Sequence, residues 1–367
     1  MNQKKRSIRK ISITLSSLLL LSFTGFSQSK DSAKISISGY VDVYRADYTD
    51  SVGLGNFQKF PSVSPRSNEF GLNVAMLTAK YAGDNVRGVI TLHYGDIPRS
   101  AWDANYNIIQ EANAGIRVSK KLWVDAGFFR THVGTEGLFP KENIASSVAI
   151  CTFFEPYYEA GFKLNYMASD KLAINLFFLN GYNMYQDNND KKSLGALVTY
   201  AFSDNFNMGY SNYTGDDSKL GDTISHLLVH NCLFLNYQKN KLKIQAGADY
   251  CMKENSDTTG TKSATMFAGL ATIRYQLQTK TGIYCRGEMF NDAQGLMSGV
   301  SVDRAGKSTG LKIWGVTAGI EYKPTDNSYI RLEARQLIAD KKQEIFYSNN
   351  YITNARTEMM IHMGVSF

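Results

Sequence analysis

Long apolar segments and closely spaced cysteines are scarce in this sequence. After residue 27 the longest apolar run is 172–179, far shorter than the roughly 18 to 20 residues that a helix needs to cross a bilayer. This excludes a helical membrane protein. The cysteines Cys151, Cys232, Cys251 and Cys285 lie on separate segments without a CxxC spacing, which excludes a disulfide scaffold. We interpret them as unpaired packing residues, with a single disulfide as the alternative.

Motifs of the common enzyme classes are also missing. The sequence contains no GxSxG, GxxxxGK, GxGxxG or HExxH pattern. His226 and His230 share a predicted strand face, but four residues at about 3.3 Å each separate them by roughly 13 Å, too far to bind one metal. The DNNDKK segment at 187–192 lacks the glycine and the distal glutamate of a calcium loop. We therefore expect no enzymatic activity, no metal and no cofactor.

The N-terminus has the pattern of a secretory signal. A basic patch over residues 4–10 precedes an apolar stretch at 11–26, and small residues flank the end of that stretch. The pattern predicts a signal peptide over 1–27, cleaved before Gln28, and a single mature domain over 28–367. An uncleaved anchor is the alternative, but the apolar stretch is short and interrupted by Ser and Thr.

The positive charge of the chain comes mostly from this leader. The formal net charge is +7, and the five basic residues of the leader account for most of it. The mature chain is then close to neutral, so the charge balance gives no reason to expect a nucleic-acid partner.

Alternation of apolar and polar residues runs from Lys34 to the end of the chain, as in β-strands with one apolar face. In the last nine residues, MMIHMGVSF, the residues Met359, Ile361, Met363 and Val365 share a face with Phe367. The same pattern predicts sixteen strands, at 34–48, 69–81, 86–94, 106–118, 122–130, 157–166, 172–179, 193–202, 206–213, 225–238, 242–252, 264–276, 280–291, 311–323, 328–340 and 357–367.

The connections between these strands alternate in length. Short connections rich in turn-forming residues lie at 82–85, 119–121, 168–171, 203–205, 239–241, 278–280 and 324–328. The others run to ten or more residues. Aromatic residues precede most of the short turns, which favours a girdle at one membrane interface.

This arrangement is expected of an outer-membrane barrel with short periplasmic turns and long extracellular loops. Backbone groups that face lipid must be paired, so the sheet must close on itself. We predict an all-β fold, a closed antiparallel transmembrane β-barrel of about 16 strands in the cell outer membrane. Its lumen is too wide for side chains alone to fill, so it is either a channel or a space blocked by loops.

The segment THVGTEGLFPKENIASSVAICTFFEPYYEAGFKLNY at 131–166 resembles the OmpL-like β-barrel porin family, which fits the general porin architecture of the whole mature chain. The residues that carry the resemblance are Gly134, Glu136, Asn143, Ser146, Ser147, Pro156, Tyr157, Tyr158 and Gly161. The resemblance implies an outer-membrane channel with a C-terminal assembly signal that ends at Phe367. It implies no particular solute.

Strand alternation places charged residues inside the barrel, because a charge facing lipid at the midplane would cost on the order of 2 to 4 kcal/mol. Four consecutive strands contribute a candidate basic pore wall: Arg274, Arg286, Lys323, Arg331 and Arg335. The connection at 131–156 carries several apolar residues, which favour folding into the lumen over exposure to water. It is the candidate constriction, and its acidic residues are Glu136, Glu142 and Glu155. The alternative places this loop outside the barrel or against a neighbouring subunit.

We therefore predict a porin that allows passive diffusion of small hydrophilic solutes or ions through a water-filled barrel. A structural or adhesive barrel with a loop-closed lumen has the same sequence pattern, and a barrel enzyme is the less favoured alternative. The expected partners are outer-membrane lipid, the barrel assembly machinery and the solutes themselves, with a homotrimer left open. A transporter that needs an N-terminal plug domain is disfavoured, because the first strand begins at about Lys34.

Overall fold

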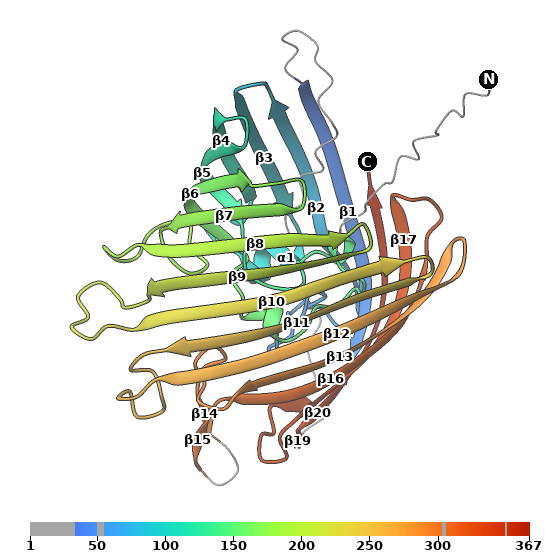
Figure 1. Cartoon of the computed structure of the whole chain (residues 1–367). Helices are drawn as coiled ribbons and strands as arrows, with labels where there is room; N and C mark the ends of the chain where they lie inside the picture. The colour runs from blue at the N-terminus through green and yellow to red at the C-terminus, as the bar shows by residue number, and fades with distance from the viewer. Residues whose placement is uncertain (1–33, 50–54, 303–305, 349–350) are drawn as a thin grey trace.

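The computed structural model describes residues 34–49, 55–302, 306–348 and 351–367, and the predicted signal peptide at 1–27 lies outside the described residues. Sixteen strands form one closed antiparallel barrel, in which each strand pairs with the next along the chain (Figure 1). The barrel strands are β1 Lys34–Tyr48, β2 Glu69–Ala82, β3 Val86–Tyr94, β4 Ile109–Ser119, β5 Leu122–Arg130, β6 Tyr158–Met167, β7 Leu172–Leu179, β8 Ser193–Ser203, β9 Phe206–Asp216, β10 Leu227–Lys239, β11 Leu242–Lys253, β12 Ala264–Gln278, β13 Thr281–Asp292, β16 Leu311–Tyr322, β17 Ser328–Ala339 and β20 Ala355–Ser366.

All sixteen predicted strands are confirmed, and the differences are confined to their ends. The strand predicted from residue 106 begins at Ile109 instead, because Tyr106 donates its backbone N–H to Asp103 in a turn before the strand. At the other extreme, β9 continues to Asp216, three residues beyond the predicted end.

The barrel closes where β1 meets β20. Residues Tyr40 to Tyr48 pair with Ser366 to Glu358 in antiparallel register. Beyond the last paired residue, the Gly39 N–H donates to the Phe367 carbonyl at 2.7 Å, and the Phe367 N–H donates back at 3.1 Å. The Phe367 ring lies directly over Gly39, where any Cβ atom would overlap it. The terminal residue is therefore part of the seam that seals the barrel.

The two faces of the wall differ as the alternation predicts. On β20 the outward residues Ile361 and Met363 are exposed, whereas the inward His362 is fully buried. Tyr81, Tyr166, Tyr275 and similar residues before the short turns are also exposed on the outer surface, as a girdle requires. An apolar, exposed outer surface around a polar interior is the arrangement that a barrel in lipid needs.

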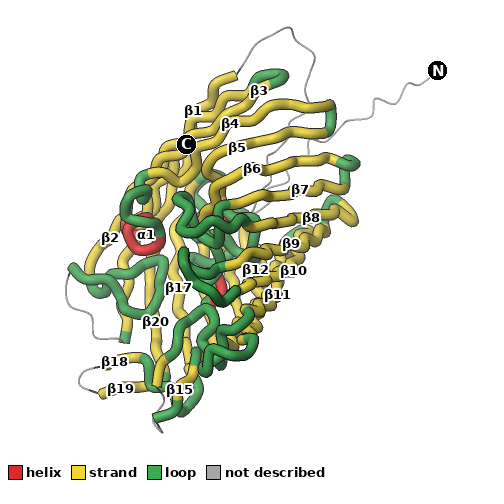
Figure 2. Tube along the Cα trace, turned by 90° about the vertical axis from the view of Figure 1, so that its left-hand side faces the viewer, coloured by secondary structure: helices red, strands yellow, loops and turns green. Residues whose placement is uncertain are grey.

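The long connections contain small elements that the sequence pattern did not predict. They are α1 Asp96–Ala101, the 3-10 turns Pro140–Glu142 and Cys151–Phe153, the hairpin of β14 Ser301–Val302 with β15 Ser308–Thr309, and the hairpin of β18 Phe346–Ser348 with β19 Tyr351–Thr353. Within the described part of the chain, no helix is long and apolar enough to cross a membrane. Loop segments and α1 lie inside the ring of strands (Figure 2).

Candidate functional site

The connection between β5 and β6, residues 131–157, fills part of the barrel interior, and we call it the inserted loop. Every residue from 132 to 152 except Lys141 is buried. Leu138 and Phe139 pack in one apolar cluster with Tyr40 and Trp102, while Ile150 packs in a second cluster with wall residues of β11 to β17. The apolar residues of the loop thus lie inside the barrel, as their composition predicted.

Two wall glutamates bind the backbone of the inserted loop. The Glu333 carboxylate on β17 accepts the N–H groups of Ser146 at 2.7 Å and Ser147 at 3.0 Å. The Glu288 carboxylate on β13 accepts the N–H of Ile150 at 2.6 Å. Charged acceptors give the stronger class of hydrogen bond, so these contacts fix the position of residues 146–150.

Positively charged wall residues also bind the inserted loop, as hydrogen-bond donors. Arg286 contacts the Glu136 carboxylate at 3.2 Å and donates to the Ser147 carbonyl at 2.7 Å. Arg331 donates to the carbonyls of Pro140 at 2.8 Å and Asn143 at 3.1 Å. These guanidinium groups therefore act as ligands of the loop as well as charges of the wall.

Two of the other predicted basic residues pair with wall glutamates. Arg335 binds Glu288 at 2.7 Å and faces Glu358 on β20 at 3.5 Å. Arg274 binds Glu321 at 2.8 Å, and Lys323 lies one residue beyond the end of β16. The predicted basic wall thus alternates with the glutamates 288, 321 and 333, and it does not form an uninterrupted basic surface.

The three loop glutamates separate into different surroundings. Glu136 reaches the wall at Arg286, whereas Glu142 pairs with Arg130 on β5. Glu155 instead lies beside Cys151 and Asp249. Of the three, Glu136 meets the predicted basic wall, in direct contact with Arg286. Burial raises the pKa of the Glu136 carboxyl, although Arg286 and the Ala149 N–H act in the opposite direction.

Two wall glycines allow the loop to approach the barrel closely. A Cβ atom at Gly247 on β11 would overlap Thr135 Oγ1, and one at Gly195 on β8 would overlap the His132 ring. His132 is itself fixed, because Nδ1 contacts Glu159 at 2.8 Å and Nε2 contacts the Asn212 carbonyl at 2.8 Å. The beginning of the loop is therefore fitted to the wall by shape as well as by charge.

A buried polar network near the β1–β20 seam was not predicted from the sequence. Ser64 Oγ lies 3.1 Å from His362 Nε2, and His362 Nδ1 lies 3.1 Å from Asp42 Oδ1. Asn73 Nδ2 also donates to Asp42 at 2.8 Å. A Ser–His–Asp series of this kind can activate a serine, but a nucleophile must reach its substrate. Ser64, His362 and Asp42 are all fully buried, so we assign the network to the packing of the seam.

The fold and its interior define a class of protein: a transmembrane β-barrel with an apolar outer surface and a charged interior, into which the inserted loop and parts of other connections fold. The chain belongs to the family described as "Putative beta-barrel porin-2, OmpL-like", whose model matches residues 34–367. The family resemblance of the segment at 131–166 is thereby confirmed, and the chain is an outer-membrane porin. A search of curated protein sequences finds no significant match.

Solved porin structures share the fold at low sequence identity. The anion-selective porin from Comamonas acidovorans superimposes with a TM-score of 0.59 at 8% identity, covering 92% of this chain and 100% of that one. OmpF of Salmonella typhi, in complex with daunomycin, gives 0.59 at 14% identity, covering 91% and 97%. The outer membrane channel DcaP of Acinetobacter baumannii gives 0.58 at 13%, covering 93% and 99%. At these identities the similarity concerns the fold.

Proposed function

We propose that the barrel carries small hydrophilic solutes across the outer membrane by passive diffusion, through an interior that the inserted loop narrows. The observation that carries the proposal is the closed sixteen-strand wall with charged residues on its inner face. A barrel of sixteen strands is wide enough to hold an aqueous path beside segments that fold into it. Glu136, Glu142 and Glu155 on the loop are then residues of the constriction, and the five predicted wall bases line the pore.

The path has a preference for anions at its periplasmic end. Near the short turns, strand alternation points more basic than acidic side chains into the barrel. The bases are Lys80, Arg87, Arg117, Lys163, Lys243, Arg274, Lys323 and Arg331, and the acids include Asp125 and Glu321. Asp125 is bound by Arg87, and Glu321 is bound by Arg274 and Arg331. The two acids therefore neutralise only part of the positive charge of the eight bases. Excess fixed charge of one sign in a narrow passage concentrates counter-ions of the other sign.

Planar bilayers with a potassium chloride gradient test this function. We expect stepwise conductance and, at about 0.1 M salt, a reversal potential that shows a preference for chloride. This selectivity should weaken towards 1 M, where the Debye length is roughly 3 Å. A reversal potential that shows a preference for potassium would overturn the proposed anion preference. Absence of conductance in folded protein would overturn the diffusion channel itself.

The extent of loop docking favours a second candidate, a structural or adhesive barrel whose lumen is closed. Several loop backbone groups bind wall charges directly, as the contacts of Glu288, Glu333 and Arg331 illustrate. Folded barrels that insert into bilayers without conducting would favour this candidate. Neither candidate includes enzymatic activity.

Export and assembly complete the proposal. Residues 1–27 direct export and are removed, and Phe367 presents the assembly signal to the barrel assembly machinery. The barrel inserts into outer-membrane lipid and assembles as a homotrimer, a state named for one structural neighbour, OmpT of Vibrio cholerae in its trimer form. Mass spectrometry of the purified protein in mild detergent tests signal-peptide removal through the N-terminal residue and the homotrimer through the number of subunits.

A further inference from the structure

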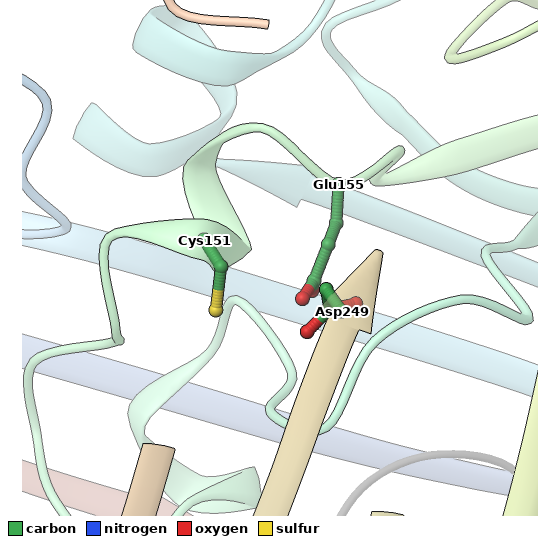
Figure 3. A group of neighbouring side chains, drawn as sticks. All are labelled: Cys151, Glu155 and Asp249. Atoms are coloured by element: carbon green, nitrogen blue, oxygen red, sulfur yellow. The ribbon is translucent and has the colours of Figure 1, made fainter. Parts of the chain in front are cut away.

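A group of buried side chains joins the end of the inserted loop to β11. Cys151 and Glu155 are one helical turn apart in the loop, and Asp249 faces them from the wall (Figure 3). A sulfur and two carboxylate oxygens from these residues lie within 4.8 Å of one another. All three side chains are at most 3% exposed. A thiol and two carboxylates thus meet in a space closed to bulk water.

Among the residues that the structure describes, two oxygens in this group have no hydrogen-bond partner. Glu155 Oε1 and Asp249 Oδ2 are both buried without a donor. Figure 3 shows the two carboxylates pointing towards each other, with the Cys151 sulfur turned to the same space. Leaving a buried charged acceptor unsatisfied is costly, and two adjacent carboxylates also repel each other. Either a proton or a cation between them removes both costs.

A histidine beside the group supports a metal arrangement. Asp249 Oδ1 lies 3.0 Å from His230 Nε2, and His230 Nδ1 lies 2.9 Å from the Tyr182 hydroxyl. Tyr182 donates its only hydroxyl proton to the Phe154 carbonyl at 2.7 Å, so His230 Nδ1 must be the donor to Tyr182. A histidine that orients a ligating carboxylate in this way is a common outer partner of metal sites.

We propose that Cys151, Glu155 and Asp249 bind a divalent transition-metal cation, with Zn²⁺ as the ion that the donors fit best. The mixed sulfur and oxygen donor set suits a borderline-soft ion and not calcium or magnesium, which prefer oxygen alone. A divalent cation offsets two of the three negative charges that a thiolate and two carboxylates carry when they bind it. This pairing of opposite charges offsets part of the cost of burying them.

A small cavity lies beside Glu155, on the side away from Cys151 and Asp249. This cavity of about 30 Å³ also borders Thr152 and Glu136, and it is large enough for one water molecule. Three protein ligands with a water in the fourth position is a familiar tetrahedral arrangement for zinc. Bound by Cys151, Glu155 and Asp249, the ion joins the inserted loop to β11 and fixes the loop end opposite the anchors at Glu333 and Arg331.

Cobalt gives the most direct test. The full-length protein is refolded from denaturant into detergent with Co²⁺ or Zn²⁺ present, because a buried site is best loaded during folding, and excess metal is removed. We expect about one metal ion per chain by mass spectrometry, and a thiolate-to-cobalt absorption band in the near ultraviolet. Cys151→Ser should abolish the band, and Glu155→Gln should weaken Zn²⁺ binding at least about tenfold. Cys285→Ser, which alters an exposed thiol on the outer wall, should change neither.

Three results would overturn the proposal. One is metal content near zero in folded wild-type protein, which leaves a proton shared between the two carboxylates. The second is a thiolate band that survives in Cys151→Ser, which assigns the metal to the other buried thiols, Cys232 or Cys251. The third is equal binding by wild type and Glu155→Gln. Heat-modifiable migration of each variant shows that it has folded, so loss of binding is not confused with loss of the barrel.

Discussion

The Glu333 carboxylate on β17 accepts the backbone N–H of Ser146 at 2.7 Å and so joins two residues 187 positions apart. It also accepts the Tyr284 hydroxyl, so one wall side chain satisfies donors from the loop and from a neighbouring strand. The inserted loop is therefore held by directional contacts to a rigid wall, and its position can be tested one contact at a time.

Removing the glutamate anchors should release the loop. In Glu288→Ala/Glu333→Ala, the N–H groups of Ser146, Ser147 and Ile150 lose their acceptors, at a cost of about 1–3 kcal/mol for each buried donor left unsatisfied. We expect higher single-channel conductance and greater proteolysis between residues 138 and 154. Glu254→Gln, in an extracellular connection, serves as the control. Unchanged conductance and proteolysis in the folded double variant would show that these contacts do not hold the loop.

A larger side chain on the wall beneath the loop should also displace the loop. Valine at Gly247 would overlap Thr135, and overpacking of this kind typically costs about 1–3 kcal/mol. We expect Gly247→Val to raise conductance and channel noise. Gly287→Val is the matched control, because a Cβ atom at Gly287 on the outer face meets nothing within 4 Å. Equal behaviour of the two variants would contradict the close approach of Thr135 to β11.

Ion preference should depend on bases near the short turns as well as on those that bind the loop. Neutralising Arg286, Arg331 and Arg335 together should shift preference towards cations, but Arg286 and Arg331 also bind loop carbonyls. Lys243→Gln/Lys323→Gln separates the two effects, since the charge changes near the short turns. We expect the anion-to-cation permeability ratio to fall by a factor of about two to three at 0.1 M salt, and much less at 1 M. A constant ratio at low salt would exclude these lysines from the conducting path.

The C-terminal residue should be needed for closure as well as for assembly. Deleting Phe367 removes both backbone hydrogen bonds to Gly39 and the ring that covers it. We expect a large loss of heat-modifiable barrel in the outer membrane, whereas Ser366→Ala should assemble normally. Normal assembly without Phe367 would contradict both roles.

The strands were predictable because their pattern is local. A charged residue such as Arg331 alternates with the apolar Ile330 and Leu332. Because lipid surrounds the barrel, the charged residue must face the interior. The same rule placed Arg286 and Arg335 inside. It could not give their partners, because Glu136 reaches Arg286 through the path of a loop that has no periodic pattern.

The less local features were missed for the same reason. Cys151 and Glu155 have helical spacing in the sequence, which is a usable signal for a shared face, but nothing in the sequence brings Asp249 to them. The seam network likewise joins Ser64 in the first long connection to His362 in the last strand. Alternation also predicted no hairpin or helix inside the long connections, because those elements are short and lie where the pattern stops.

Single-channel conductance of the wild type and of a variant lacking residues 138–154 tests the central claim most directly. The deletion removes the packed middle of the inserted loop and leaves every barrel strand intact. We expect small, anion-preferring steps for the wild type and larger steps for the deletion variant at the same voltage and salt. Folded barrels of both proteins with equal conductance, or with none, would contradict a diffusion channel that the loop narrows.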